Sequence, residues 1–187
     1  MRIVARSLCL LAVGIVSTMG LVTLPRATAN DFMIVPGERI GDVSFSMSID
    51  DILKQLGPPS NVVRSGSGAQ AQALYSWRTH FLRVNQSLEN GRVVSIRTYW
   101  IFRTTNPYKT EKGAAIGASA QMIMQAYGEG CFSQDYSTSR ELYWPKQGIF
   151  FIIAQSGDAP AEILNRVNEI GVRRAVTGEV RGWKLCS

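Results

Sequence analysis

The chain has 187 residues, 45% of them hydrophobic, and a formal charge of +6, which allows one domain with a hydrophobic core. The charge is too mild to indicate a nucleic-acid partner. His80 is the only histidine, so the sequence offers no His pair for a metal and no second histidine for a proton relay. We therefore expect no enzyme activity and no cofactor.

Residues 1–29 have the pattern of a cleavable signal peptide. Arg2 and Arg6 precede an apolar stretch over 8–22, and small residues at 27–29 form a signal-peptidase site. The apolar stretch is about 15 residues long, short of the ~20 that cross a bilayer as a helix, so cleavage is favoured over an uncleaved anchor. Cleavage would leave a chain of charge +3, which we expect to be periplasmic or secreted and to have no stable membrane span.

The first predicted unit, residues 30–105, contains a helix between Ser48 and Gly57. The Ser48 hydroxyl is a suitable N-cap, and Asp51, three residues later, has the spacing of a capping box. Gly57 suits the left-handed turn at a helix end, and two prolines after it forbid continuation. Three antiparallel strands are then predicted, at 74–77, 81–84 and 92–98, after a polar loop over 64–72.

The second predicted unit, residues 106–187, repeats this order. Residues 116–128 align with 45–57 without a gap, and Ser119 takes the N-cap position. Residues 160–170 also fit helical spacing, so a helix there is the alternative to a third strand. The three strands are predicted at 141–144, 149–153 and 166–172, after a polar loop over 133–139.

These elements predict an α+β fold. Two tandem units, each a helix plus a three-stranded antiparallel sheet, would form one curved sheet with both helices on one face. The other face of the sheet would be left open. An open face of this kind is suited to binding.

Two cysteines, Cys131 and Cys186, remain once the signal peptide and Cys9 are removed. An even number in an oxidising compartment predicts a disulfide between them, with two separate buried thiols as the alternative. Closing a loop of about 55 residues would stabilise the fold by roughly 4 kcal/mol through the unfolded chain. We expect the bond to fix the C-terminal tail.

Short motifs in the first unit suggest a family. They are Ser46-Met47-Ser48 before the helix, Leu56-Gly57-Pro58-Pro59 at its end, Tyr75-Ser76-Trp77 in the first strand and Gly91-Arg92-Val93-Val94-Ser95-Ile96 in the third. This pattern resembles the outer-membrane assembly lipoproteins of the SmpA/OmlA type, and equally the secreted β-lactamase-inhibitor proteins, which carry such a unit in tandem. The resemblance implies function through protein–protein contact without catalytic residues.

Strand alternation assigns each side chain to one face of the predicted sheet. If Val94 and Ile96 point inward, their neighbours point to the open face. Arg and Tyr are enriched at protein interfaces, although they also simply cover solvated sheets. The candidate partner-binding residues on this face are Arg78, Arg97, Tyr99, Tyr143 and Arg173.

The sequence therefore predicts an exported, non-catalytic protein-binding or envelope-assembly module. The alternative is a periplasmic protein that binds a small ligand or lipid between helices and sheet, because Met122 and Met124 of the second helix could pack around varied apolar ligands. Methionines also fill cores. An enzyme would become credible only if His80 lay against an acidic side chain in a cleft.

Overall fold

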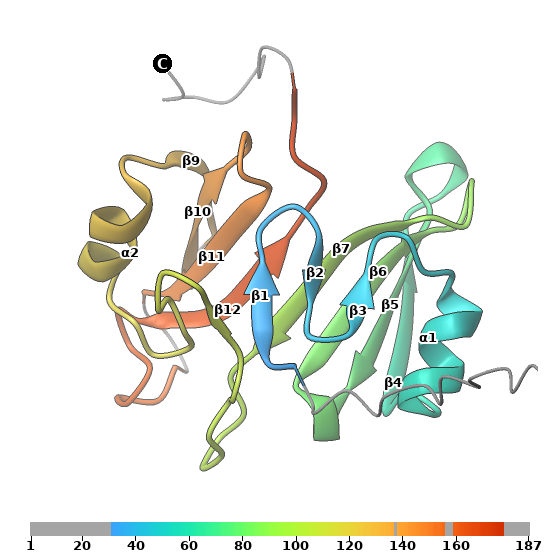
Figure 1. Ribbon diagram of the computed structural model, residues 1–187, viewed down its shortest axis with the longest axis horizontal. Helices are drawn as coiled ribbons and strands as arrows, with labels where there is room; N and C mark the ends of the chain where they lie inside the picture. Colours follow the sequence, from blue (N-terminus) through green and yellow to red (C-terminus); the bar gives the residue numbers. More distant parts are fainter. Residues whose placement is uncertain (1–30, 137, 156–158, 178–187) are drawn as a thin grey trace, which may run out of the picture.

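The computed structural model describes residues 31–136, 138–155 and 159–177. The predicted signal peptide and Cys186 lie outside these ranges. The described chain is mostly β and contains two short helices, α1 (Ile49–Leu56) and α2 (Ala120–Tyr127), and two sheets. Figure 1 shows α1 and α2 at opposite ends of the molecule with the small sheet between them.

The large sheet has eight antiparallel strands in the order β4-β5-β6-β7-β12-β11-β10-β9. Its first four strands follow chain order and its last four reverse it, so the order is symmetric about the β7–β12 pair. The predicted boundary near residue 105 between two structural units is not tested by this strand order and remains a prediction. The strands are β4 (Asn61–Ser65), β5 (Gln72–Trp77), β6 (Leu82–Ser87), β7 (Val93–Tyr99), β9 (Cys131–Tyr136), β10 (Ser139–Trp144), β11 (Ile149–Ala154) and β12 (Val167–Val172).

The small sheet has four strands in the order β3-β2-β1-β8, with β8 parallel to β1. Ile34 and Ile40 from this sheet join one hydrophobic core with Ile52 of α1, Ile123 of α2 and Ile96 of β7. The small sheet and both helices therefore pack on the same face of the large sheet. The strands are β1 (Met33–Val35), β2 (Arg39–Ile40), β3 (Val43–Ser44) and β8 (Lys109–Thr110).

Both helices begin and end where the sequence predicts. The Ser48 hydroxyl accepts from the Asp51 amide at 3.2 Å, and the Asp51 carboxylate accepts from the Ser48 amide at 3.3 Å, which completes the capping box. Gly57 follows α1 with a φ of 76°, a region open to glycine. At α2 the Ser119 hydroxyl accepts from the Met122 amide at 3.2 Å.

The predicted α+β fold of two helix-plus-three-strand units is wrong. The large sheet alone has eight strands, and the four short strands of the small sheet were not predicted. Strands β4 and β9 extend into the segments predicted as loops. Every residue of β4 is exposed. This edge strand therefore lacks the alternation of apolar and polar residues by which a strand is recognised in a sequence.

The ambiguous segment after Pro160 resolves into a turn followed by a strand. The Ile163 amide donates to the Pro160 carbonyl at 3.0 Å, and Asn165 then takes a positive φ of 57°, which ends the turn. Strand β12 follows and pairs with both β7 and β11. The predicted third strand is confirmed, and the alternative helix over 160–170 is wrong.

Candidate functional site

We call the face of the large sheet opposite the helices and the small sheet the outer face. Residues directly paired across antiparallel strands share a face. The register pairs residue 83 with 97, 97 with 171, 171 with 150 and 150 with 143. Their neighbours along the strands, such as Leu82, Ile170 and Phe151, belong to the core. One row across the outer face is therefore Arg83, Arg97, Gly171, Phe150 and Tyr143.

A second row on the same face contains Tyr99, Glu169 and Glu141. Glu169 is only 7% exposed and holds two guanidinium groups. Its carboxylate accepts from Arg83 Nη1 at 3.0 Å and from Arg97 Nη1 at 2.8 Å. A nearly buried carboxylate requires such paired charge, because desolvation would otherwise disfavour its ionised form.

Glu141 and Arg173 form a separate ion pair on the other half of the outer face. Arg173 donates from Nη1 and Nη2 to the two carboxylate oxygens of Glu141, at 3.2 and 3.4 Å. Glu141 is 3% exposed, whereas Arg173 is half-buried. A bidentate ion pair of this kind fixes the orientation of the guanidinium plane as well as its position.

Aromatic rings pack against the guanidinium groups of the same arginines. The Arg83 guanidinium lies 4.0 Å from the centroid of the Tyr99 ring, and that of Arg173 lies 4.3 Å from the Phe150 ring. Arg97 approaches the same Phe150 ring at 5.2 Å. These are cation–π distances. We call Arg83, Arg97, Arg173, Tyr99, Phe150, Glu141 and Glu169 the arginine–aromatic array.

Gly171 makes this stacking possible. The Phe150 ring lies directly over the Gly171 backbone, so that a Cβ atom at position 171 would overlap the ring. Glycine weakens a strand interior because it has no side chain to pack, and it often marks a close approach. Here the ring of the opposite residue fills that space, and Phe150 is fully buried although it belongs to the outer face.

The structure brings together four of the five predicted partner-binding residues. Arg97, Tyr99 and Arg173 belong to the array, and Tyr143 packs against it, 6.5 Å from the Phe150 ring, with an exposure of 3%. Arg78 lies elsewhere. Strand β5 ends one residue before it, and Arg78 begins the exposed 3₁₀ turn η2 (Arg78–His80), where strand alternation no longer applies.

Sequence reasoning missed four of the seven residues of the array, namely Arg83, Phe150, Glu141 and Glu169. Glu141 and Glu169 are acidic residues next to apolar residues in predicted strands, which is a signal that each needs a cationic partner if it is buried. Arg83 lies in a predicted strand but could not be matched to Glu169, which is 86 residues away in the sequence. Only the pairing of β7 with β12 brings these residues together.

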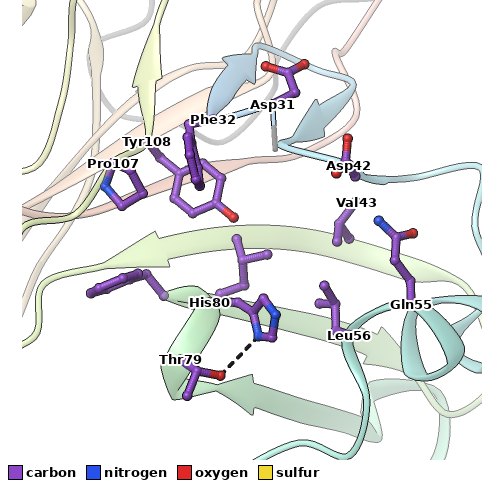
Figure 2. Close-up of a pocket in the computed structure, with 12 residues that line it drawn as sticks. Asp31, Phe32, Asp42, Val43, Gln55, Leu56, Thr79, His80, Pro107 and Tyr108 are labelled. Atoms are coloured by element: carbon purple, nitrogen blue, oxygen red, sulfur yellow. Dashed lines mark hydrogen bonds between the residues drawn. The ribbon is translucent and has the colours of Figure 1, made fainter. Parts of the chain in front are cut away.

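A second candidate site is a pocket of about 410 Å³ on the opposite side of the large sheet, beside α1. Figure 2 shows its lining, with Asp31 and Asp42 on one side and His80 with Thr79 on another. The pocket is lined by Asp31, Phe32, Asp42, Val43, Gln55, Leu56, Thr79, His80, Phe81, Leu82, Pro107 and Tyr108.

Two ionisable groups of the pocket have shifted pKa values. The pKa of Asp31 is lowered because its carboxylate accepts from Arg39 Nη1 at 2.6 Å and from the Met33 amide at 2.9 Å. Burial raises the pKa of Tyr108 to about 12, and the negative charges of Asp42 and Asp31 add to this effect. These shifts keep the Asp31 carboxylate ionised and the Tyr108 phenol un-ionised at neutral pH.

His80 shares this pocket with two carboxylates but bonds to neither. Its Nδ1 lies 3.1 Å from Thr79 Oγ1, and among the described residues this is its hydrogen-bonding contact. The histidine–carboxylate pair that would favour an enzyme is thus not formed in the described chain. No group of three or more His, Cys, Asp or Glu side chains in this part of the protein could hold a metal.

The methionines that suggested a ligand pocket lie elsewhere. Met122 and Met124 are 56% and 42% exposed on the surface of α2 and do not line the pocket. Within the described ranges, no helix has the length and apolar character to cross a membrane. Cys131 begins β9, whereas Cys186 is outside the described residues, so their disulfide remains a prediction.

Comparisons with known proteins place the chain by its fold. No family model and no curated protein sequence matches it. It is similar to the crystal structure of the uncharacterized protein YfeY from Escherichia coli, with a TM-score of 0.53 and 14% identity over 77% of this chain and 99% of that one. It is also similar to a DUF4309 family protein, YjgB, from Bacillus subtilis, with a TM-score of 0.48 and 12% identity over 74% of this chain and 88% of that one.

The chain therefore has the same fold as YfeY. At 14% identity this likeness concerns the fold alone. The resemblance to SmpA/OmlA lipoproteins and β-lactamase-inhibitor proteins is tested by none of these comparisons and remains a prediction.

Proposed function

We propose that the protein is an exported, non-catalytic binding module that engages a protein partner of the cell envelope or extracellular space through the outer face of its large sheet. The arginine–aromatic array carries this proposal. It lies on the face turned away from both helices and the small sheet. Arginine and aromatic residues contribute much of the binding energy at protein interfaces.

The array supports binding because its arginines are already held in place. Arg97 is fixed by Glu169 and by the Phe150 ring, and Arg173 by Glu141 and the same ring. A side chain ordered before binding loses less conformational entropy when the partner arrives. Affinity per contact is therefore higher than for freely rotating surface arginines.

The array also retains hydrogen-bond donors for a partner. A guanidinium group has five N–H donors, and Glu169 engages one from each of Arg83 and Arg97. Acceptor groups of a partner, such as carboxylates or backbone carbonyls, are the chemistry that these donors fit.

Two sequence features support the cellular setting of this proposal. The N-terminal pattern of basic residues, apolar stretch and small residues is typical of exported proteins. The resemblance to SmpA/OmlA and β-lactamase-inhibitor proteins favours function by protein–protein contact. A solvated face that binds nothing is the alternative, because the ion pairs of the array also stabilise the isolated fold.

Site-specific photo-cross-linking in envelope extract tests the proposal. A benzophenone amino acid at position 99 keeps an aromatic ring in the array, whereas the same group at exposed position 122 of α2 samples the opposite side of the molecule. We expect one dominant cross-linked protein from position 99 and not from position 122. Arg97→Gln should abolish that product, and the control Arg78→Gln, outside the array, should leave it unchanged. A product insensitive to Arg97→Gln would contradict the proposal.

Binding of a small molecule is a second candidate function. The observation that favours it is the pocket of about 410 Å³ beside α1, a size within the range of ligand sites in proteins. Native mass spectrometry of protein from its own host tests this candidate, since a copurifying small molecule would support it.

A further inference from the structure

We infer that the pocket beside α1 binds a small organic cation, specifically an alkyl chain ending in a primary ammonium group. The inference is independent of the outer face, because the pocket lies on the other side of the large sheet. Three properties of its lining carry the inference: the sign of its charge, a hydroxyl group that has no protein partner and is open to the pocket, and its aromatic walls.

The charge of the lining favours a cation. Asp31 and Asp42 both line the pocket, and no lysine or arginine is among the described lining residues. Arg39 partly neutralises Asp31 through a 2.6 Å ion pair. Asp42 is exposed and has no ion pair or hydrogen bond with its side chain in the described structure. A carboxylate beside a low-dielectric wall concentrates cations locally.

The Tyr108 hydroxyl is a polar group without a partner. Tyr108 is only 6% exposed, and its hydroxyl makes no hydrogen bond in the described chain. In Figure 2 this hydroxyl points from the Tyr108 ring into the space between Val43 and His80. The hydroxyl oxygen is not among the fully buried unpartnered atoms of the described chain, so it is open to the pocket and can accept from a ligand that enters it. An ammonium N–H would donate to the phenolic oxygen.

Aromatic and aliphatic side chains complete the site. The Phe32 ring packs edge-on against Tyr108, with centroids 5.5 Å apart, yet 41% of Phe32 remains exposed. Ring faces attract organic cations, and Val43 and Leu56 offer apolar surface to an alkyl chain.

Phe81 is held in an unusual backbone conformation at the same pocket. Its φ is 56°, in the left-handed region that a bulky residue rarely adopts. Strained backbone of this kind clusters at ligand sites, where the surrounding structure maintains it.

A matched series of probes tests the inference. Using ¹⁵N-labelled protein, we would titrate n-butylammonium, its neutral analogue 1-butanol and the anion butanoate, and follow backbone amide shifts by NMR. We expect saturable shifts at the pocket residues with n-butylammonium, with a Kd in about the millimolar range for so small a ligand. Binding of 1-butanol should be at least about tenfold weaker, as expected for loss of a charge-assisted contact.

Two variants and one control locate the binding. Asp42→Asn and Tyr108→Phe should each weaken n-butylammonium binding at least about fivefold, through the lost charge and the lost hydroxyl. Glu89→Gln removes a carboxylate beyond the other end of β6 and should leave the Kd unchanged. The same spectra report whether each variant is folded. Equal binding of 1-butanol and n-butylammonium, or an unchanged Kd in a folded Asp42→Asn variant, would overturn the inference.

Discussion

Replacing Glu169 with glutamine should destabilise the protein more than any other single loss of charge on the outer face. The glutamine side chain has nearly the same volume, so packing is preserved. It carries no charge, however, and can present only one oxygen to two guanidinium groups. Its amide NH₂ group must then face Arg83 or Arg97. Both groups are hydrogen-bond donors, so no hydrogen bond can form between them.

The expected magnitude follows from the two bonds that Glu169 accepts. Hydrogen bonds to charged groups contribute about 1.5–3 kcal/mol each in mutational series. The arginine side chains are 36% and 25% exposed, so solvent screens them and the lower end of this range applies. We expect a loss of about 2–3 kcal/mol in the free energy of unfolding, or about 5–10 °C in Tm for a domain of this size.

Glu141→Gln is the matched comparison. Glu141 is as deeply buried as Glu169 but binds one arginine, through longer contacts of 3.2 and 3.4 Å. We expect a loss of about 1 kcal/mol. Urea denaturation followed by circular dichroism measures both variants. If Glu169→Gln costs no more than Glu141→Gln, the bridging role assigned to Glu169 is refuted.

Three further predictions concern other parts of the fold. Gly171→Ala should lower the free energy of unfolding by about 2 kcal/mol or more, because the added methyl group overlaps the Phe150 ring; partial recovery by Phe150→Leu in urea denaturation is the check. The pKa of Tyr108 is raised from 10.0 to about 12, so the un-ionised phenol favours the folded state. Its contribution to the free energy of unfolding is complete below pH 10 and is lost as the pH rises through 12. Phenolate absorbance, with the Tyr108→Phe variant as the reference, should show this tyrosine ionising at about pH 12. Mature protein from an oxidising compartment should contain no free thiol, so alkylation without reductant should leave Cys131 and Cys186 unmodified; two alkylated cysteines in the mass spectrum would show that the disulfide is absent.

Features determined by near neighbours in the chain were predictable from the sequence. The ends of α1 are set by the capping box of Ser48 and Asp51 and by Gly57, and each of these residues contacts backbone within one or two helical turns of itself. The inward faces of β5 and β10 were also predictable, because Trp77 and Trp144 occupy equivalent positions in these strands and are 1% and 5% exposed.

Features that depend on distant partners were not predictable. Strand β4 is exposed at an edge of the large sheet and is recognisable only by its pairing with β5. The strands of the small sheet are two or three residues long, too short for any periodic pattern, and β8 joins β1 from far along the chain. Three of the seven residues of the array were predicted, and its ion pairs were not, since Glu169 meets Arg97 across 72 residues.

The β7–β12 pair has a consequence for how the chain folds. Until β12 is available, β7 presents an unpaired edge, and β11 presents another. Contacts between residues so distant in sequence form slowly, because a long loop must close before they stabilise anything. A chain that ends before residue 167 would expose both edges permanently and would tend to aggregate through them. At high concentration, β12 of one molecule could complete the sheet of another, so that slow refolding should yield a domain-swapped dimer alongside the monomer.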